Sequence, residues 1–221
     1  MLNNIVWDSL IGEHKHLSLG QARACRYRPE ISPFAAVVDD APESWSELAS
    51  IVEPGEVILV RKNKPADVLT WKIESETSVV QYVLAGDAPA ALGTGLRKLG
   101  REHVPAMLEL TELVLPGYFR ERGIEMGAFY GIFDGEKLAA MTGERVFPAP
   151  YKEITAVCTH PDYQGRGYAA KLVQHVSHLM REAGLKPFLH TGEANTRARA
   201  LYERLGFINN GVALTYALRR I

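Results

Sequence analysis

Residues 158 to 170 read CTHPDYQGRGYAA, and this stretch decides how the C-terminal part of the chain folds. It follows the apolar run 152–160, KEITAVCTH, and contains two glycines, Gly165 and Gly167, around a single arginine. The run predicts a strand that is apolar enough on both faces to be central in a sheet. After the glycines, apolar residues recur at helical spacing until Gly184 supplies a stop. The sequence therefore predicts a strand that turns through a glycine loop directly into a helix.

This loop is suited to binding an anion. The first backbone N–H groups of a helix have no partner inside it, and the helix dipole favours negative charge there. Missing side chains at Gly165 and Gly167 would let a phosphate reach those groups, and Arg166 adds a positive charge. The alternative is that the glycines only permit a tight turn. The loop matches neither a Walker A motif, which needs Gly-Lys-Ser/Thr, nor the dinucleotide fingerprint, because position 170 is alanine.

The elements around the loop predict a sheet covered by helices. An Asp134–Gly135 turn indicates a hairpin, and Asn195 is suited to cap a second helix. The expected strands are 96–99, 127–133, 137–146, 152–160, 187–191 and 211–220, and the expected helices are 102–114, 168–183 and 196–205. Their order implies parallel strands joined by a crossover helix, so the fold class is α/β with a mixed α+β sheet.

A small N-terminal α/β unit is expected before this sheet. Small residues, glycine and proline collect in AGDAPAALGTG (85–95), which is the candidate linker. The strands expected before it are 34–38, 56–62 and 79–85, and the expected helix is 42–52. We therefore divide the chain into residues 1–90, whose role is unassigned, and a domain from 94 to 221.

Composition narrows the partners. The 221 residues are 47% hydrophobic and 23% charged with a formal net charge of −1, which indicates a globular protein without a basic field for nucleic acid. No uncharged apolar run approaches the ~20 residues that span a bilayer, so no membrane partner is expected. Cys25 and Cys158 are interpreted as free thiols, and a cytoplasmic location is expected. The pair of histidines in EHKH (13–16) lacks further ligands, so no metal is expected.

Two motifs resemble those of a known family. Gln164 to Ala169, QGRGYA, satisfies the pattern Q/R-x-x-G-x-G/A of the GNAT superfamily of acyl-CoA-dependent N-acyltransferases. Residues 195–207, NTRARALYERLGF, resemble its second signature, N-x-x-A-x-x-L-Y-x-x-L-G-F. The resemblance covers about residues 94 to 221. The passage from Pro116 to Glu144 is similar to the branch related to glycine N-acyltransferase, and the N-terminal unit is a candidate degenerate half of the same fold.

The resemblance implies a site for acetyl-CoA. It implies central strands that splay apart between 152–160 and 187–191, with the pantetheine arm in the gap. The residues implied to bind the co-substrate are Val157, Cys158 and Thr159 through their backbone, Gln164, Gly165, Arg166, Gly167, Tyr168 and Ala169 around the pyrophosphate, and Asn195 beside the arm.

Transfer of an acyl group to an amine needs a base, an oxyanion site and an acid. The resemblance implies Glu153 as the general base, with Glu144 on the neighbouring strand as the reserve, and Tyr202 as the acid that protonates the CoA sulfur. The backbone N–H of Val157 or Cys158 would hold the oxyanion. Packing alone also explains Tyr202, because it lies on the apolar stripe of its helix, and a strand end alone explains Glu153. We interpret the Cys158 side chain as packing.

The expected function is that of an N-acetyltransferase, which carries acetyl from acetyl-CoA directly to a primary amine of a small molecule or peptide. The alternative is a non-catalytic module that senses or binds acyl-CoA. The acceptor stays unidentified, although Tyr118, Phe119 and Arg120 would suit an amphipathic or anionic one. His190 is a candidate for lining the acceptor site, and a homodimer is a further expectation.

Overall fold

The computed structural model describes residues 2–20, 22–61, 63–65, 69–86 and 95–221. Within these ranges eleven strands form one mixed sheet. In spatial order they are β1 (Ser18–Gly20), β2 (Ala24–Tyr27), β3 (Phe34–Val37), β4 (Val57–Arg61), β11 (Phe207–Arg220), β5 (Trp71–Leu84), β10 (Lys186–Gly192), β9 (Tyr151–Thr159), β8 (Lys137–Glu144), β7 (Phe129–Asp134) and β6 (Arg97–Leu99). The α/β class with a mixed sheet is confirmed.

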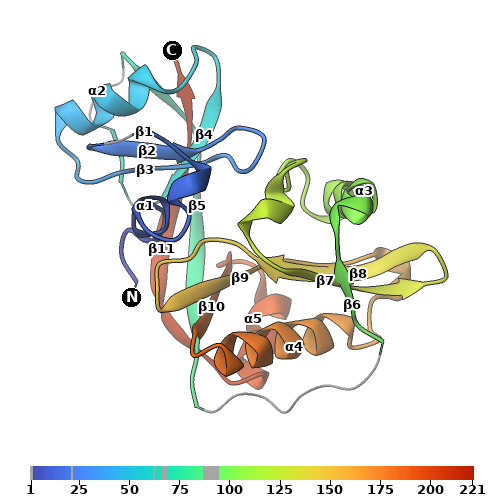
Figure 1. The fold of residues 1–221 in the computed structure, drawn as a ribbon. Coiled ribbons are helices and arrows are strands. Elements are labelled where there is room, and N and C mark those ends of the chain that lie inside the picture. The colour runs from blue at the N-terminus through green and yellow to red at the C-terminus, as the bar shows by residue number, and fades with distance from the viewer. Residues whose placement is uncertain (1, 21, 62, 66–68, 87–94) are drawn as a thin grey trace.

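Helices cover both faces of the sheet. The described helices are α1 (Ile5–Ile11), α2 (Pro42–Ser50), α3 (Val104–Val114), α4 (Tyr168–Glu182) and α5 (Thr196–Arg204), with short 3₁₀ helices η1 (Lys15–Leu17), η2 (Arg101–His103), η3 (Gly123–Met126) and η4 (Pro161–Tyr163). In the C-terminal half, α4 and α5 lie on one face and α3 lies on the other (Figure 1). Among the described residues, no helix combines the length and the apolar character that a membrane crossing requires.

The two longest strands join the N-terminal unit to the rest of the molecule. β5, which precedes the predicted boundary, lies between β10 and β11, and its partner β11 continues along β4 (Figure 1). The predicted strand at 79–85 therefore begins earlier, at Trp71. Residues 87–94, most of the predicted linker, lie outside the described residues. The sheet consequently runs through both units without a break between two separate sheets.

The sequence predicted the elements around the glycine loop closely. β9 and β10 run parallel, as the crossover through α4 requires. α4 buries the predicted stripe, including Leu172, Val173 and Val176, against the sheet. Each such buried side chain contributes ~1.5–3 kcal/mol of hydrophobic stabilisation, which fixes the helix and the loop that starts it.

A bulge opens the centre of the sheet. Ala156 has a positive φ of 49°, and the register between β8 and β9 shifts between Gly143 and Met141. Pairing of β9 with β10 ends at Ile154 and Leu189, whereas β10 continues along β5 to Gly192. The splayed central strands are therefore present, and the edge of β9 beyond the bulge has no neighbouring strand among the described residues.

Candidate functional site

The glycine loop presents free backbone N–H groups at the start of α4. Gly165 and Gly167 have φ of 80° and 76°, a left-handed region that favours glycine, and Gly167 caps the helix. The first N–H bond into the helix runs from Lys171 to the carbonyl of Gly167. The N–H groups of Tyr168 and the two alanines after it therefore have no partner within the helix.

A groove of about 390 Å³, here called the α4 groove, runs from this loop to α5. Nine residues predicted from the sequence line it: Val157, Thr159, Gln164, Gly165, Gly167, Tyr168, Ala169, Asn195 and Tyr202. Cys158 and Arg166, which were also predicted to bind the co-substrate, do not line the groove. The Cys158 side chain is fully buried on the α3 side of the sheet, and burial raises the pKa of its thiol to about 12, in keeping with a packing role. Arg166 lies over the Tyr163 ring at 4.8 Å.

The open edge of β9 faces the groove through two backbone N–H groups. The N–H of His160 bonds to the carbonyl of Ala139 beside β8. Because successive N–H groups of a strand point to opposite edges, those of Val157 and Thr159 point toward the gap. Both residues line the α4 groove, whereas Cys158 does not. Of the two oxyanion donors considered, Val157 therefore has the better placed N–H.

Tyr202 reaches the groove from α5. Its ring packs between Tyr82 and Phe207, and the residue is 5% exposed. Burial raises the pKa of its hydroxyl, so the proton stays on the oxygen at neutral pH. Asn195 caps α5 by accepting a bond from the Ala198 N–H at 3.1 Å. The predicted cap is confirmed.

Arg197 is a groove residue that the sequence reasoning missed. Its Nη1 donates to Oε1 of Gln164 at 2.9 Å, which links α5 to the glycine loop. The sequence signal that could have identified Arg197 is its position in the first turn of α5, two residues after the predicted cap Asn195. A guanidinium there adds positive charge where a phosphate group would lie.

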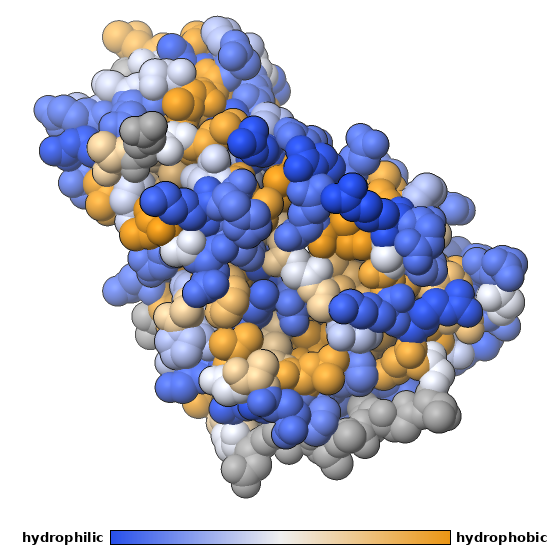
Figure 2. Space-filling model, in the orientation of Figure 1, coloured by the Kyte–Doolittle hydropathy of each residue, from blue (hydrophilic) through white to orange (hydrophobic). Residues whose placement is uncertain are grey.

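A second, smaller cavity lies on the opposite face of β9. This α3 cavity, of about 30 Å³, is enclosed by the end of α3, the loop after it, the bulge and the N-terminal unit. Its lining includes Ser32, Leu115, Tyr118, Arg120, Glu144, Arg145, Thr155 and Ala156. Consecutive residues line the two sites: Val114 and Val157 line the α4 groove, and Leu115 and Ala156 line the α3 cavity. Figure 2 shows a hydrophilic surface between the N-terminal unit and the lobe that carries α3.

Glu144 is the carboxylate that lines the α3 cavity. Its Oε2 accepts a bond from the Ala128 N–H at 3.0 Å and lies 3.2 Å from Nζ of Lys152. Gly127 makes room for it, because a Cβ there would lie 2.5 Å from the Glu144 Cβ. Both contacts use Oε2, so Oε1 is left to accept a proton from a molecule in the cavity.

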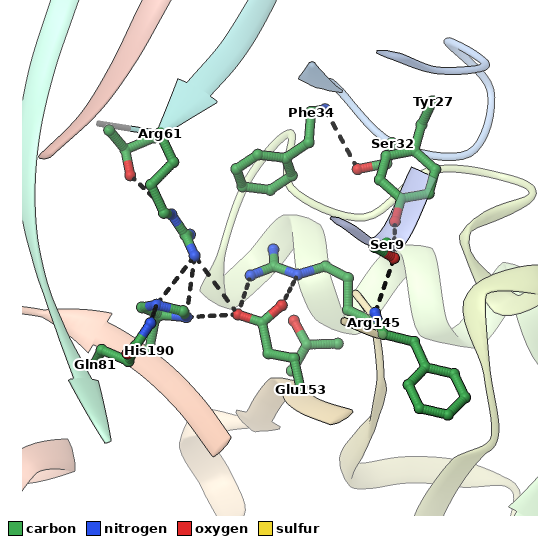
Figure 3. A network of polar contacts seen from close by, with 12 residues as sticks. Ser9, Tyr27, Ser32, Phe34, Arg61, Gln81, Arg145, Glu153 and His190 are labelled. Carbon is green, nitrogen blue, oxygen red and sulfur yellow. Dashed lines mark hydrogen bonds and ion pairs between the residues drawn. The ribbon is translucent and has the colours of Figure 1, made fainter. Parts of the chain in front are cut away.

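Glu153 lies in a buried cluster of charges instead. Its oxygens accept a bidentate pair of bonds from Nε and Nη2 of Arg145 at 2.8 and 2.9 Å, and a bond from Nδ1 of His190 at 2.7 Å. Arg61 brings Nη1 to 3.9 Å from the same carboxylate. Figure 3 shows these three side chains converging on Glu153. Glu153 is 1% exposed and lines neither the groove nor the cavity.

The cluster holds Glu153 in its ionised form. Burial by itself raises the pKa of the carboxyl, but the Arg145 charge and the bonds from His190 and Arg145 outweigh it, so the pKa lies well below its ordinary value. A carboxylate with so low a pKa is a weak proton acceptor. The role of Glu153 as general base stays a prediction that its surroundings disfavour.

His190 is the neutral member of the cluster. Its Nδ1 donates to Glu153, while its Nε2 accepts from Nη1 of Arg61 and Nε2 of Gln81, both at 3.1 Å. Burial, followed by the Arg61 charge, lowers the pKa of the imidazole to about 4. Its side chain is 4% exposed, and it lines neither the groove nor the cavity.

We expect this histidine to make stability depend on pH. The unfolded imidazole binds a proton below its ordinary pKa of about 6.5, whereas the folded one does so only below about 4. Between these values the unfolded state holds more protons, so the free energy of unfolding falls as the pH falls, by about 3 kcal/mol in all. His190→Gln should flatten this part of the curve in denaturant titrations from pH 7 to 4.

His14 provides an independent check on that measurement. Burial lowers the pKa of His14 to about 4 as well, so it also makes the free energy of unfolding fall between pH 7 and 4. His14→Gln should remove the His14 contribution and leave that of His190. The double variant should then show the shallowest profile. A slope that His190→Gln leaves unchanged would contradict a neutral, buried imidazole.

Comparison with known proteins agrees with this geometry. Residues 129–215 match the family model described as FR47-like protein. A solved structure of a GNAT-family protein from Novosphingobium aromaticivorans is 32% identical, with a TM-score of 0.91 over 99% of this chain and 98% of that one. A GCN5-related N-acetyltransferase from Kribbella flavida shares the fold at 11% identity, with a TM-score of 0.63 over 98% of this chain and 96% of that one. No curated protein matches the sequence.

A splayed sheet with a glycine loop at the start of a helix defines an acyltransferase of the GNAT type. The chain belongs to the GNAT superfamily, and the family resemblance drawn from the two motifs is confirmed. The finer likeness to glycine N-acyltransferase stays a prediction.

Proposed function

We propose that the protein transfers the acetyl group of acetyl-CoA to a primary amine. The observation that carries this proposal is that one short stretch of β9 serves both sites, because Ala156 lines the α3 cavity and Val157 lines the α4 groove. A thioester that follows the groove to the bulge would there face an amine held in the cavity. The two reactants would be brought together from opposite faces of one strand.

The groove fits the co-substrate. The free N–H groups at the start of α4 and the Arg197 guanidinium suit a pyrophosphate, and the open edge of β9 offers N–H groups to the amides of a pantetheine arm. Among the described residues no cluster of three or more metal-ligating side chains occurs. The chemistry that we propose is a direct transfer between acetyl-CoA and the amine, carried out by side chains and backbone.

Each step of the transfer has a candidate group. Oε1 of Glu144 would accept the proton of the attacking amine, which is mostly protonated at neutral pH because a lysine-like amine has a pKa of ~10.4. The N–H of Val157 would stabilise the oxyanion of the tetrahedral intermediate. Tyr202 would protonate the departing thiolate, because it lines the groove and its hydroxyl carries a proton at neutral pH. We favour Glu144 over Glu153 as the base because Glu144 lines the cavity.

The test is turnover with acetyl-CoA and a panel of primary amines, followed as release of free thiol. Glu144→Gln should lower kcat by about 10²- to 10⁴-fold, the range for loss of a general base. Tyr202→Phe should lower kcat while leaving acetyl-CoA affinity within a few-fold, because the ring keeps its packing. Wild-type levels of thiol release from Glu144→Gln would contradict the assigned base.

The non-catalytic alternative makes a different forecast. Acetyl-CoA would bind in calorimetry, yet no amine in the panel would release thiol. That pair of results would favour an acyl-CoA sensor or scaffold over an enzyme.

A further inference from the structure

The buried cluster around Glu153 carries more positive than negative charge. Two guanidinium groups, Arg61 and Arg145, surround the single carboxylate of Glu153. His190 adds no charge, because its Nε2 accepts bonds from two N–H donors and therefore bears no proton. The sum of +2 and −1 leaves one positive charge. Burial lowers the pKa of Arg61, but a guanidinium remains protonated at neutral pH.

Arg145 presents this excess charge to the α3 cavity. Its Nε and Nη2 are occupied by Glu153, which leaves Nη1 without a bond to that carboxylate. Among the described residues, the Tyr118 side chain is a further hydrogen-bond partner of the guanidinium. Arg145 lines the cavity although it is only 9% exposed. Glu153 and the rings of Phe34 and Tyr118, which lie 4.8 and 5.5 Å from the guanidinium carbon, hold it in one orientation.

The other charges of the cavity do not neutralise it. Glu144 is matched by Lys152, and Arg120 adds a further cation at the exposed rim. The excess positive charge of the cluster is buried, and burial strengthens its attraction to an ion of opposite sign. The cavity wall that Arg145 forms is therefore built to meet an anion.

We propose that the acceptor is a small amine that carries an anionic group, which Arg145 contacts, and that Glu153 is a positioning residue that aims Arg145. The inference rests on the proposed acetyl transfer and specifies its acceptor class. Glu144 and Arg145 are adjacent in sequence and both line the α3 cavity. At about 30 Å³ this cavity has the volume of one water molecule, so it must widen at its rim to admit the acceptor. The amine would lie beside Glu144 and the anion beside Arg145, so the two groups are separated by a short linker.

Matched acceptors test the class. β-Alanine and β-alaninamide have the same amine and linker but end in an anionic carboxylate and a neutral amide, and 2-aminoethylphosphonate replaces the carboxylate by a different anion. We expect kcat/KM to be about 10- to 100-fold higher for the anionic members than for the amide, the discrimination of one or two charge-assisted bonds. The amine of β-alaninamide is less basic, so a larger fraction of it is unprotonated at neutral pH. This difference alone would favour the amide, so it cannot produce the expected preference for the anionic acceptors. The ratio of carboxylate to phosphonate rates identifies the preferred anion.

Two arginine variants locate the recognition. Arg145→Lys keeps the charge but loses the planar donor geometry, and it should reduce the preference for the anionic acceptors about tenfold or more. Arg26→Lys is the matched control, because Arg26 is also buried and also binds a carboxylate, Glu56, in bidentate fashion away from the cavity. It should leave the preference unchanged. A preference that survives equally in both variants would overturn the role of Arg145.

A third variant separates positioning from base catalysis and guards against misfolding of Arg145→Lys. Glu153→Gln keeps the side-chain volume and one acceptor for Arg145. A positioning role predicts a higher KM for β-alanine, by about tenfold for a weakened charge-assisted bond, with unchanged KM for the amide, unchanged acetyl-CoA affinity and an unchanged pH profile. Lower kcat for both acceptors with an altered pH profile would instead make Glu153 the base.

The two proposals fail in different ways. If no amine releases thiol, the acetyl transfer itself is wrong. If thiol is released at equal rates from β-alanine and β-alaninamide, the transfer stands and the anionic acceptor is wrong.

Discussion

Gly167→Val is expected to abolish measurable binding of acetyl-CoA. The valine Cβ would find open space, since no atom lies within 4 Å of its position, so the substitution acts through the backbone and the groove. At a φ of 76° a β-branched residue is strained by about 1–3 kcal/mol, and relaxing that strain moves the N–H groups that start α4. The new side chain also enters the groove that Gly167 lines. Losing two charge-assisted bonds to phosphate weakens binding about 100-fold or more, which calorimetry would detect.

Gly184→Val is the matched control for this prediction. Gly184 follows the other end of α4, has a φ of 73°, and likewise has no atom within 4 Å of the place that a Cβ would take. The two variants should lose similar thermal stability, but Gly184→Val should bind acetyl-CoA within a few-fold of the wild type. Equal affinities in the two variants would mean that the glycine loop is only a turn.

The region that sequence predicted best is the one where local signals agree with the fold. Glycines with positive φ, an Asn195 cap and a helical apolar stripe each act within a few residues, so they can be recognised without tertiary structure. The hairpin around Asp134–Gly135 is confirmed for the same reason, with Gly135 at a φ of 59°. The co-substrate side of the candidate site was accessible from sequence because it is built from such local motifs.

The N-terminal unit gave weaker signals. α1 has seven residues and no side-chain cap, and it is held by burying Ile5, Val6 and Leu10 against the core. Helices this short gain little from intrinsic propensity, so packing decides them. The first half of β5 has the polar sequence KIESETS (72–78) and therefore gives no apolar strand signal. It forms a strand because its backbone pairs with β11. The division into residues 1–90 and 94–221 and the idea of a degenerate half-domain stay predictions.

The acceptor side could not be assembled from sequence. Arg61 and Arg145 look like ordinary exposed charges in or beside strands, and only the sheet order brings them within reach of Glu153 and His190. Arg61 and Glu153 lie 92 positions apart in the sequence, yet the Arg61 guanidinium contacts the Glu153 carboxylate in the folded chain. The position of Glu153 at the start of its strand therefore gave no sign of the cations that surround it.

Glu153→Leu is expected to destabilise the protein more than any surface charge substitution. Removing one member of a buried ion pair leaves the others without compensation, which costs about 3–5 kcal/mol. Here the cost falls on Arg145 and on Arg61, both of which are buried. The free energy of unfolding from denaturant titration at pH 7 measures it. Glu74→Leu is the control, because Glu74 pairs with Arg219 at the surface, where solvent screens the pair and the loss should be much smaller.

A double variant distinguishes loss of charge balance from loss of packing. If the unpaired Arg145 guanidinium causes the instability, Glu153→Leu combined with Arg145→Met should be more stable than Glu153→Leu alone, because apolar replacement of a whole buried pair is often neutral. If packing at β9 is the cause, the second substitution should add its own cost. The Arg61 charge remains in both variants, so the double variant should still fall short of the wild type. Full wild-type stability of Glu153→Leu itself would contradict a carboxylate that balances the buried charges of Arg61 and Arg145.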